Sequence, residues 1–299
     1  MMNFKPAKIS AFLRRQSQME VLPLVTIMVL VLVLMMAHLT WAIAVPIKAL
    51  VIAGLLFKRV RTDPRMWCVL TALLAVALYV DWHPRDNHQY LIIYLSLMLF
   101  CIFHISREHR DQVLATSGRL LIGAVMVFAV IWKAITPDYL SGDFFHHGLL
   151  THPHLQNIAA VFTDVCADVL AENSQIVALF DLNYLTTTPE DSVAIEGSPQ
   201  IGTMAFVMTW WTIAIEAIIA LLFLWPRRFG GGHSVVFYGR HLALALFIAT
   251  TYPPAPIIGF GWALVILGLA DCADRPTVLR PLYVALFFFL LFAGFLTVF

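Results

Sequence analysis

The sequence predicts an all-α fold, a polytopic membrane helix bundle of about seven to nine helices with an amphipathic external segment. Two observations predict this class. Of the 299 residues, 61% are hydrophobic and 12% are charged, and the mean hydropathy is +0.83. A soluble domain of this length cannot bury so much apolar surface, so lipid is expected around most of the chain. In addition, the apolar residues fall into runs of helix length.

Seven apolar runs supply the predicted helices. They span residues 21–57, 66–81, 90–105, 120–135, 201–225, 242–270 and 281–299. The first run exceeds the roughly 20 residues of one span and contains Pro46, which predicts a helix followed by a second, shorter one. The sequence "YPPAP" interrupts the sixth run, and because proline removes a backbone donor, two helices or half-helices are expected there.

The N-terminal segment is basic and precedes the first apolar run. Ala42, Ile43 and Ala44 would suit signal-peptide cleavage, but the run from Val21 to Trp41 is longer than the usual apolar region of about 7–15 residues. An uncleaved first helix is therefore predicted.

The four cysteines form no CxxC pair and are expected to be packing residues rather than disulfides or metal ligands.

Basic connections set the predicted orientation, because lysine and arginine are retained on the cytoplasmic side. They occur in the N-terminal segment and in the connections 58–65, 106–119 and 226–241. No lysine or arginine lies between Lys133 and Arg227, whereas residues 136–200 carry nine acidic residues. We therefore expect a cytoplasmic N-terminus and an external 136–200 segment, in a bacterial inner membrane. The whole chain, 1–299, is interpreted as one membrane domain that includes this external segment.

The external segment contains a predicted amphipathic helix, "NIAAVFTDVCADVLAEN", from Asn157 to Asn173. Its apolar residues recur at helical spacing opposite three acids. The apolar residues are Ile158, Val161, Phe162, Val165, Val169 and Leu170. Interfacial helices are usually basic, so an acidic polar face favours a helix that caps the bundle over one that lies on the lipid.

Glu216 is the clearest candidate for function, because ionisable groups at membrane depth are costly. It shares one helical face with Thr209 and Thr212 in an otherwise apolar run, which predicts an internal polar cavity. The alternative is a carboxyl that is neutral, or paired across helices, and serves structural specificity alone. Lys133 ends its apolar run, where it either extends to the interface or turns inward and acts as a base. We hypothesise that it turns inward towards the Glu216 cavity.

Histidines suggest a metal site as an alternative, because imidazole binds iron and zinc. His83, His88, His146, His147, His152 and His154 are expected outside, and His104 and His109 inside. Because the two sets lie on opposite sides of the membrane, one joint cluster is not expected. Two interpretations remain for the outer set: a site for a metal such as zinc, or polar surface residues near the membrane. We adopt the second, and no metal site is predicted. A net charge of +1 gives no reason to expect nucleic acid as a partner.

Three segments together resemble a known family. They are "DNHQYLIIYLSLML" (Asp86–Leu99), "KAITPDYLSG" (Lys133–Gly142), and the run from Glu216 through "LLFLWPRR" to His241 and "PIIGFGWALVILGLA". In order and spacing they are similar to the transmembrane domain shared by vitamin K-dependent gamma-carboxylase and the bacterial horizontally transferred transmembrane (HTTM) proteins. The resemblance covers residues 20–275.

In the carboxylase, this resemblance implies a lysine base that activates vitamin K hydroquinone at the outer membrane face. Anchored on "DYLSG", the family's lysine falls on Ala134, one residue or about 100° of helix from Lys133. Tyr139 replaces the family's tryptophan. No large external domain is expected to hold a protein substrate, so protein gamma-carboxylation is not expected.

Two functions follow from these residues and the resemblance. The first is an HTTM-like accessory or binding subunit of a membrane-protein complex. The alternative is a membrane enzyme that uses a quinone or another lipid-soluble cofactor, with Lys133 or Glu216 as the acid or base. The candidate cofactor-binding residues are Asn87, His88, Thr209, Thr212 and His241. The expected partners are the lipid bilayer and a larger membrane complex.

Overall fold

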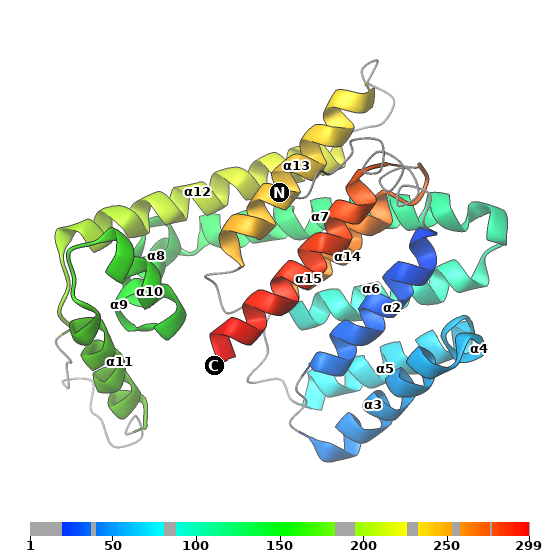
Figure 1. Cartoon of the computed structure of the whole chain (residues 1–299), viewed down its shortest axis with the longest axis horizontal. Helices are drawn as coiled ribbons and strands as arrows, with labels where there is room; N and C mark the ends of the chain where they lie inside the picture. Colours follow the sequence, from blue (N-terminus) through cyan, green and yellow to red (C-terminus); the bar gives the residue numbers. More distant parts are fainter. Residues whose placement is uncertain are drawn as a thin grey trace, which may run out of the picture. The chain divides into compact units, whose positions relative to one another are not determined.

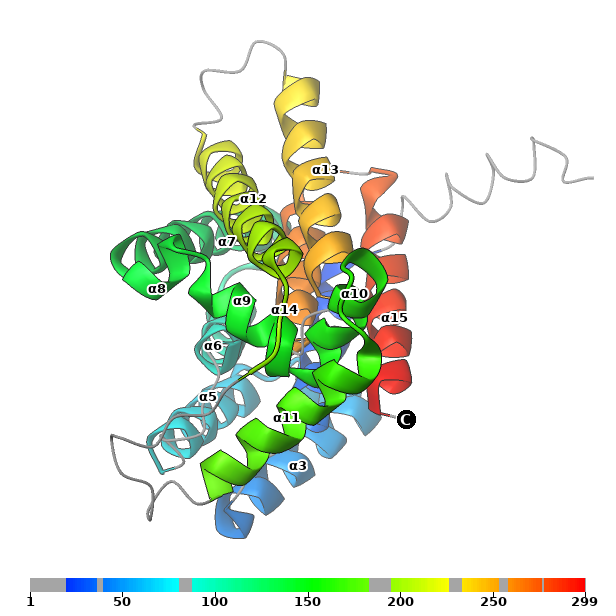
Figure 2. The same ribbon diagram turned by 90° about the vertical axis from the view of Figure 1, so that its left-hand side faces the viewer.

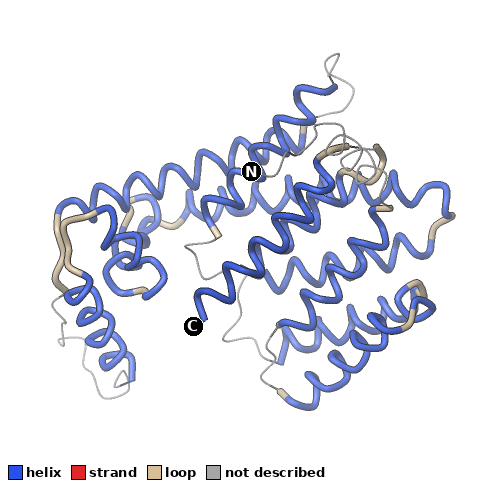
Figure 3. Tube along the Cα trace, viewed as in Figure 1, coloured by secondary structure: helices blue, strands red, loops and turns tan. Residues whose placement is uncertain are grey.

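The computed structural model describes residues 20–36, 40–80, 88–182, 195–225, 233–252, 258–275 and 277–298. Within these ranges the chain forms fourteen α-helices and one 3-10 helix, η1, and no strand (Figures 1 and 3). This confirms the predicted all-α class. The helices exceed the predicted seven to nine because residues 136–200 and two connections form helices of their own.

The helices have the following bounds: α2 Val21–Met35, α3 Trp41–Leu56, α4 Lys58–Arg61, α5 Pro64–Val80, α6 His88–His104, η1 Arg107–His109, α7 Arg110–Ile135, α8 Pro137–Leu140, α9 Asp143–Thr151, α10 Pro153–Phe162, α11 Ala167–Leu182, α12 Pro199–Leu224, α13 His233–Thr251, α14 Ile258–Asp271 and α15 Leu279–Val298.

The first apolar run forms two helices, as predicted, but the division is not at Pro46. The division precedes Trp41, and Pro46 lies inside α3. Because proline has no amide hydrogen, the carbonyl of Ala42, four residues earlier, loses its hydrogen bond within the helix. The second helix is also not the shorter one. The ammonium of Lys48 lies at the end of α2, where it donates hydrogen bonds to the carbonyls of Val33 (3.3 Å), Leu34 and Met36 (2.5 Å). Carbonyls at the end of a helix need such partners from outside it.

The sixth apolar run also forms two helices, as predicted. Helix α13 ends at Thr251 and α14 begins at Ile258, on either side of "YPPAP". Prolines 253, 254 and 256 lie outside the described residues.

The chain divides into two compact groups, and the division falls within α7 and α12. The first group holds the chain up to Gly123, the part from Leu222 to Tyr252, and the part that begins at α14. Helices α2, α3, α5 and α6 lie side by side in it (Figure 1). Helix α14 is its core, since residues 261–271 are all buried and the helix contacts α2, α6, α13 and α15. A helix that is apolar all round is expected to be buried on all sides.

The second group comprises residues 124–221, in which α9, α10 and α11 pack against one another (Figure 2). Its core joins these helices to the beginning of α12. The core residues are Leu149, Leu150, Leu155, Ala159, Leu170, Ile201 and Ala205. Residues 136–200 and the beginning of α12 therefore share an apolar core.

The predicted helix Asn157–Asn173 is wrong as a single element. Helix α10 ends at Phe162 and α11 begins at Ala167. Thr163 between them is extended, and its hydroxyl donates to the carbonyl of Ala159 (2.6 Å) and accepts from the amide of Val165 (3.4 Å). Such local side-chain bonds compete with the helix. Phe162, predicted on the packed face, is 73% exposed.

Two of the described helical segments are long and apolar enough to cross a membrane, namely Arg107–Ile135 and Pro199–Leu224. Seven further apolar segments, counted over the residues whose side chains are described, have 10–17 residues each. These counts rest on length and composition.

Candidate functional site

An ion pair joins α7 and α12 in the second group. The ammonium of Lys133, in the last turn of α7, contacts Oε1 of Glu216 in the middle of α12. The side chains are only 15% and 7% exposed, respectively. Lys133 therefore turns inward, whereas its neighbour Ala134 is exposed. A pair this deeply buried depends on its partners, because the removal of either one leaves the other charge uncompensated.

A tyrosine extends this polar site. The Tyr139 hydroxyl lies 2.8 Å from Oγ1 of Thr212, and the Thr212 hydroxyl donates to the carbonyl of Thr209 (2.9 Å). Because that bond uses the only hydroxyl hydrogen of Thr212, Tyr139 must be the donor to Thr212. Burial raises the pKa of Tyr139, so the phenol keeps its proton. The Lys133 ammonium also lies 5.2 Å from the centre of the Tyr139 ring, a cation–π contact.

Two oxygens of this site have no hydrogen-bond partner within the described chain. They are Oε2 of Glu216 and Oγ1 of Thr209, and both are buried. Buried polar atoms are nearly always bonded, so each such atom is a place where a ligand or a water can bind. A surface groove lined by Phe162, Gln200, Thr203 and Met204 lies near the beginning of α12, away from Glu216.

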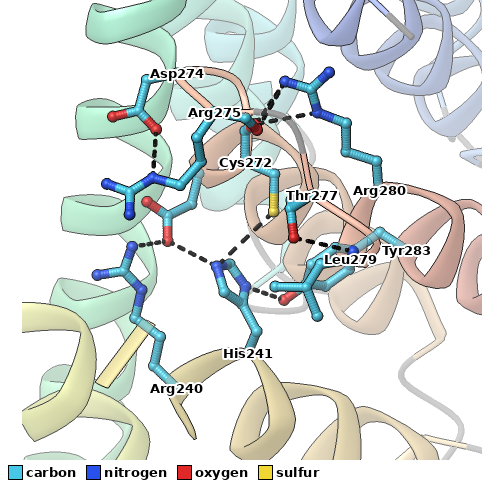
Figure 4. Close-up of polar contacts among 10 residues, drawn as sticks. Arg240, His241, Cys272, Asp274, Arg275, Thr277, Leu279, Arg280 and Tyr283 are labelled. Carbon is cyan, nitrogen blue, oxygen red and sulfur yellow. Dashed lines mark hydrogen bonds and ion pairs between the residues drawn. The ribbon is translucent and has the colours of Figure 1, made fainter. Parts of the chain in front are cut away.

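His241 belongs to a second polar cluster, which lies in the first group (Figure 4). Its Nδ1 lies 2.6 Å from the Tyr283 hydroxyl, and its Nε2 lies 3.3 Å from Oδ2 of Asp271 and 3.8 Å from Sγ of Cys272. Nη2 of Arg240 lies 2.6 Å from the same Asp271 oxygen. All five side chains are buried, and they connect α13 to α15 and to the end of α14.

The geometry of this cluster differs from that of a nucleophilic triad. In a triad, the acid and the nucleophile occupy opposite nitrogens of the histidine ring. Here Asp271 and Cys272 approach the same nitrogen, and Tyr283 occupies the other. No reacting atom of the cluster is exposed to a substrate. Its contacts make it an internal cross-link between helices.

The structure brings four of the predicted site residues into one compact group, namely Lys133, Thr209, Thr212 and Glu216. His241 belongs to the other group. Asn87 lies outside the described residues, and so does the side chain of His88, although its backbone begins α6.

Sequence reasoning missed Tyr139, Arg240, Asp271 and Tyr283 as members of polar sites. In the sequence, Tyr139 is notable only as a replacement for the family's tryptophan. The sequence places Arg240 in the basic connection 226–241, whereas in the structure it lies in α13 and is 4% exposed. One signal was readable: Asp271 directly follows the apolar run "WALVILGLA", in which an acid is costly.

The histidines of residues 136–200 form no metal site in the part of the chain that the structure describes, where no group of three His, Cys, Asp or Glu side chains could hold a metal ion. The rings of His152 and His154 are 5.5 Å apart. Burial, and then the charge of His154, lower the pKa of His152.

Comparisons with protein-family models, with curated proteins and with solved structures find no match for this chain. The candidate site is therefore defined by its own geometry.

Proposed function

We propose that this chain is an HTTM-like integral membrane protein that acts as a binding or accessory subunit. Its binding site is the polar site around Lys133 and Glu216. The ligand is a neutral, lipid-soluble molecule that carries a hydrogen-bond donor.

The surfaces of α7 and α12 support the membrane location. Large apolar side chains are exposed along both helices, in segments long enough to span a bilayer. They include Phe128, Ile131, Trp132, Val207, Trp210 and Leu221. Apolar surface of this extent would promote aggregation in water, whereas lipid covers it without cost.

The observation that carries the binding proposal is the half-satisfied ion pair. One oxygen of Glu216 meets Lys133, and the other lacks a donor within the described chain. In hydrocarbon a water molecule is scarce, so a ligand hydroxyl or N–H is the natural donor. Because Lys133 and Glu216 already balance each other, a charged ligand would add an uncompensated buried charge. This favours a neutral ligand.

Protein gamma-carboxylase activity is not part of this proposal. The position that matches the family's lysine is Ala134, which is exposed, and Lys133 is engaged with Glu216.

One observation favours a second function, that of an enzyme with a quinone-like cofactor. Lys133 and Glu216 are in direct contact, so a proton can pass between them and a bound hydroxyl without rearrangement.

The test is the recovery of bound molecules from the purified full chain. Neutral lipid-soluble compounds that carry a hydroxyl or N–H are extracted from the protein and quantified by mass spectrometry. Thr209→Val removes one polar group and keeps the ion pair and the side-chain shape. We expect it to reduce the occupancy about tenfold, which corresponds to roughly 1.4 kcal/mol for one hydrogen bond. Glu216→Gln is expected to reduce it at least as much.

Thr203→Val is the matched control. Its hydroxyl already donates to the carbonyl of Pro199 (3.3 Å) on the exposed side of the same helix. The Thr203→Val protein should carry the same amount of bound compound as the wild type. If all four proteins carry the same compounds in the same amounts, the site binds none of them and the proposal is wrong.

A further inference from the structure

The turn between α3 and α5 has an unusual surface. We call residues Leu56–Arg65 the cationic turn; it includes the short helix α4. It contains four basic residues and one acid, Asp63. The side chains of Lys58, Arg59 and Arg65 are exposed and make no hydrogen bond or ion pair with any described residue. Leu56 and Phe57, directly before them, are 70% and 60% exposed.

The backbone of the cationic turn is held by several bonds. The indole N–H of Trp67, which is fully buried, donates to the carbonyl of Arg61 (2.8 Å). The Arg61 guanidinium in turn donates to the carbonyl of Leu55 at the end of α3 (3.3 Å). Asp63 accepts from the amide of Arg65 (2.9 Å), which caps the beginning of α5. The exposed cations are therefore presented from a fixed scaffold.

We propose that the cationic turn binds the headgroups of anionic phospholipids in the leaflet that it faces. This inference rests on the proposed membrane location. Along the chain, two exposed apolar side chains come first and the exposed cations follow. That order matches the passage from acyl chains to phosphates at a bilayer surface. Arginine matches phosphate through paired N–H donors, and Arg59 and Arg65 supply two such groups.

An acidic protein or a nucleic acid would also be attracted by the charges. Neither needs Leu56 and Phe57, which would stay exposed to water beside such a partner. A lipid leaflet covers the exposed apolar side chains and the exposed cations at once, and for this reason we infer a lipid partner.

The connection between α6 and α7 provides an internal contrast. Arg107 is also an exposed arginine, but it neighbours Glu108, which accepts from Ser106 (3.4 Å) and lies 3.5 Å from His109. Phe103, the nearest aromatic residue, is buried. In this connection the positive charge of Arg107 is balanced by the negative charge of Glu108, and no exposed apolar side chain directly precedes it as Leu56 and Phe57 precede the cations of the cationic turn. The connection should therefore not select anionic lipid.

The experiment measures the binding of phosphatidylglycerol and phosphatidylcholine to the full chain by native mass spectrometry. The wild type should prefer phosphatidylglycerol. Arg59→Gln should weaken its binding about fivefold, and the triple variant K58Q/R59Q/R65Q about hundredfold, since each basic residue near a surface contributes a similar increment. Arg107→Gln, which removes the same charge, should change it less than twofold.

Equal losses for Arg59→Gln and Arg107→Gln would show an effect of net charge alone and would overturn the inference. So would a wild type without preference for phosphatidylglycerol. Carbonate extraction of cell membranes distinguishes a failure of the lipid-binding inference from a failure of the proposed membrane location. A chain that stays in the membrane but shows no preference contradicts only the lipid site, whereas a chain released by carbonate contradicts both.

Discussion

At the scale of single residues, several cationic side chains in the described part of the chain are met by specific groups. Lys48 donates to the carbonyls that end α2, and Arg280 donates to those of Cys272, Ala273 and Arg275 after α14. These cations replace helix caps, since the last carbonyls of a helix have no partner within it. Lys133 differs from both, because its partner is a carboxylate on another helix.

The first prediction concerns that pair. Lys133→Met and Glu216→Met should each lower the free energy of unfolding by about 3–5 kcal/mol, because each leaves one charge buried alone. The double variant should be much closer to the wild type, since two apolar side chains replace the pair. Denaturation of the purified proteins in detergent measures these values. Effects that simply add in the double variant would show that the two side chains do not interact.

The double variant also separates stability from binding. A protein that is stable but has lost its bound lipid-soluble compound would place the pair in the binding site. Retention of the compound would leave the pair a structural role alone.

At the scale of helices, glycines set how closely neighbours approach. A Cβ built on Gly268 of α14 would lie 2.4 Å from the ring of Tyr283 on α15. A Cβ on Gly118 of α7 would lie 2.7 Å from the carbonyl oxygen of Leu267. Small residues allow such close packing between apolar helices. The contact at Gly268 also fixes Tyr283, whose hydroxyl bonds His241.

The second prediction tests this packing. Gly268→Ala should destabilise the protein by about 1–3 kcal/mol, because the added methyl displaces a fully buried tyrosine. Gly239→Ala in α13 is the control, since a Cβ there meets nothing within 4 Å. It should be neutral or stabilising by up to about 1 kcal/mol, the helix preference of alanine over glycine. Thermal unfolding followed by circular dichroism compares the two. Similar midpoints for both variants would contradict the packing argument.

At the scale of the whole molecule, the distribution of charge remains the strongest indication of topology. Lysine and arginine are concentrated in a few short stretches of the sequence, such as the cationic turn. No basic residue occurs between Lys133 and Arg227. Because lysine and arginine are retained on the cytoplasmic side, this distribution predicts that residues 136–200 lie outside and the basic stretches lie inside.

The third prediction is this orientation. In a variant without the four native cysteines, Ser141→Cys should react with a membrane-impermeant maleimide added to intact cells. Arg59→Cys should react only after the membrane is permeabilised. Both positions are exposed in the structure, so access depends on the side of the membrane. The reverse pattern would invert the topology, and labelling of both in intact cells would argue against a membrane-spanning chain.

The sequence alone determined the all-α class and most helix positions, because hydrophobicity and proline act locally along the chain. It identified Glu216 with Thr209 and Thr212, since positions three, four and seven residues apart share a helix face. It also selected Lys133 as the group to examine. Local patterns did not reveal that Thr163 ends a helix, because its hydroxyl competes with a helical bond of similar strength.

Only the tertiary structure decided which charges are buried together. Glu216 and Lys133 are 83 residues apart, and Tyr139 meets Thr212 across 73 residues. Arg240 and Asp271 are 31 residues apart and were not paired by any sequence pattern, yet they form a buried ion pair beside His241. Such pairs form because a charge removed from water needs a partner within a few ångströms, and the packing of helices distant in sequence determines which partner it meets.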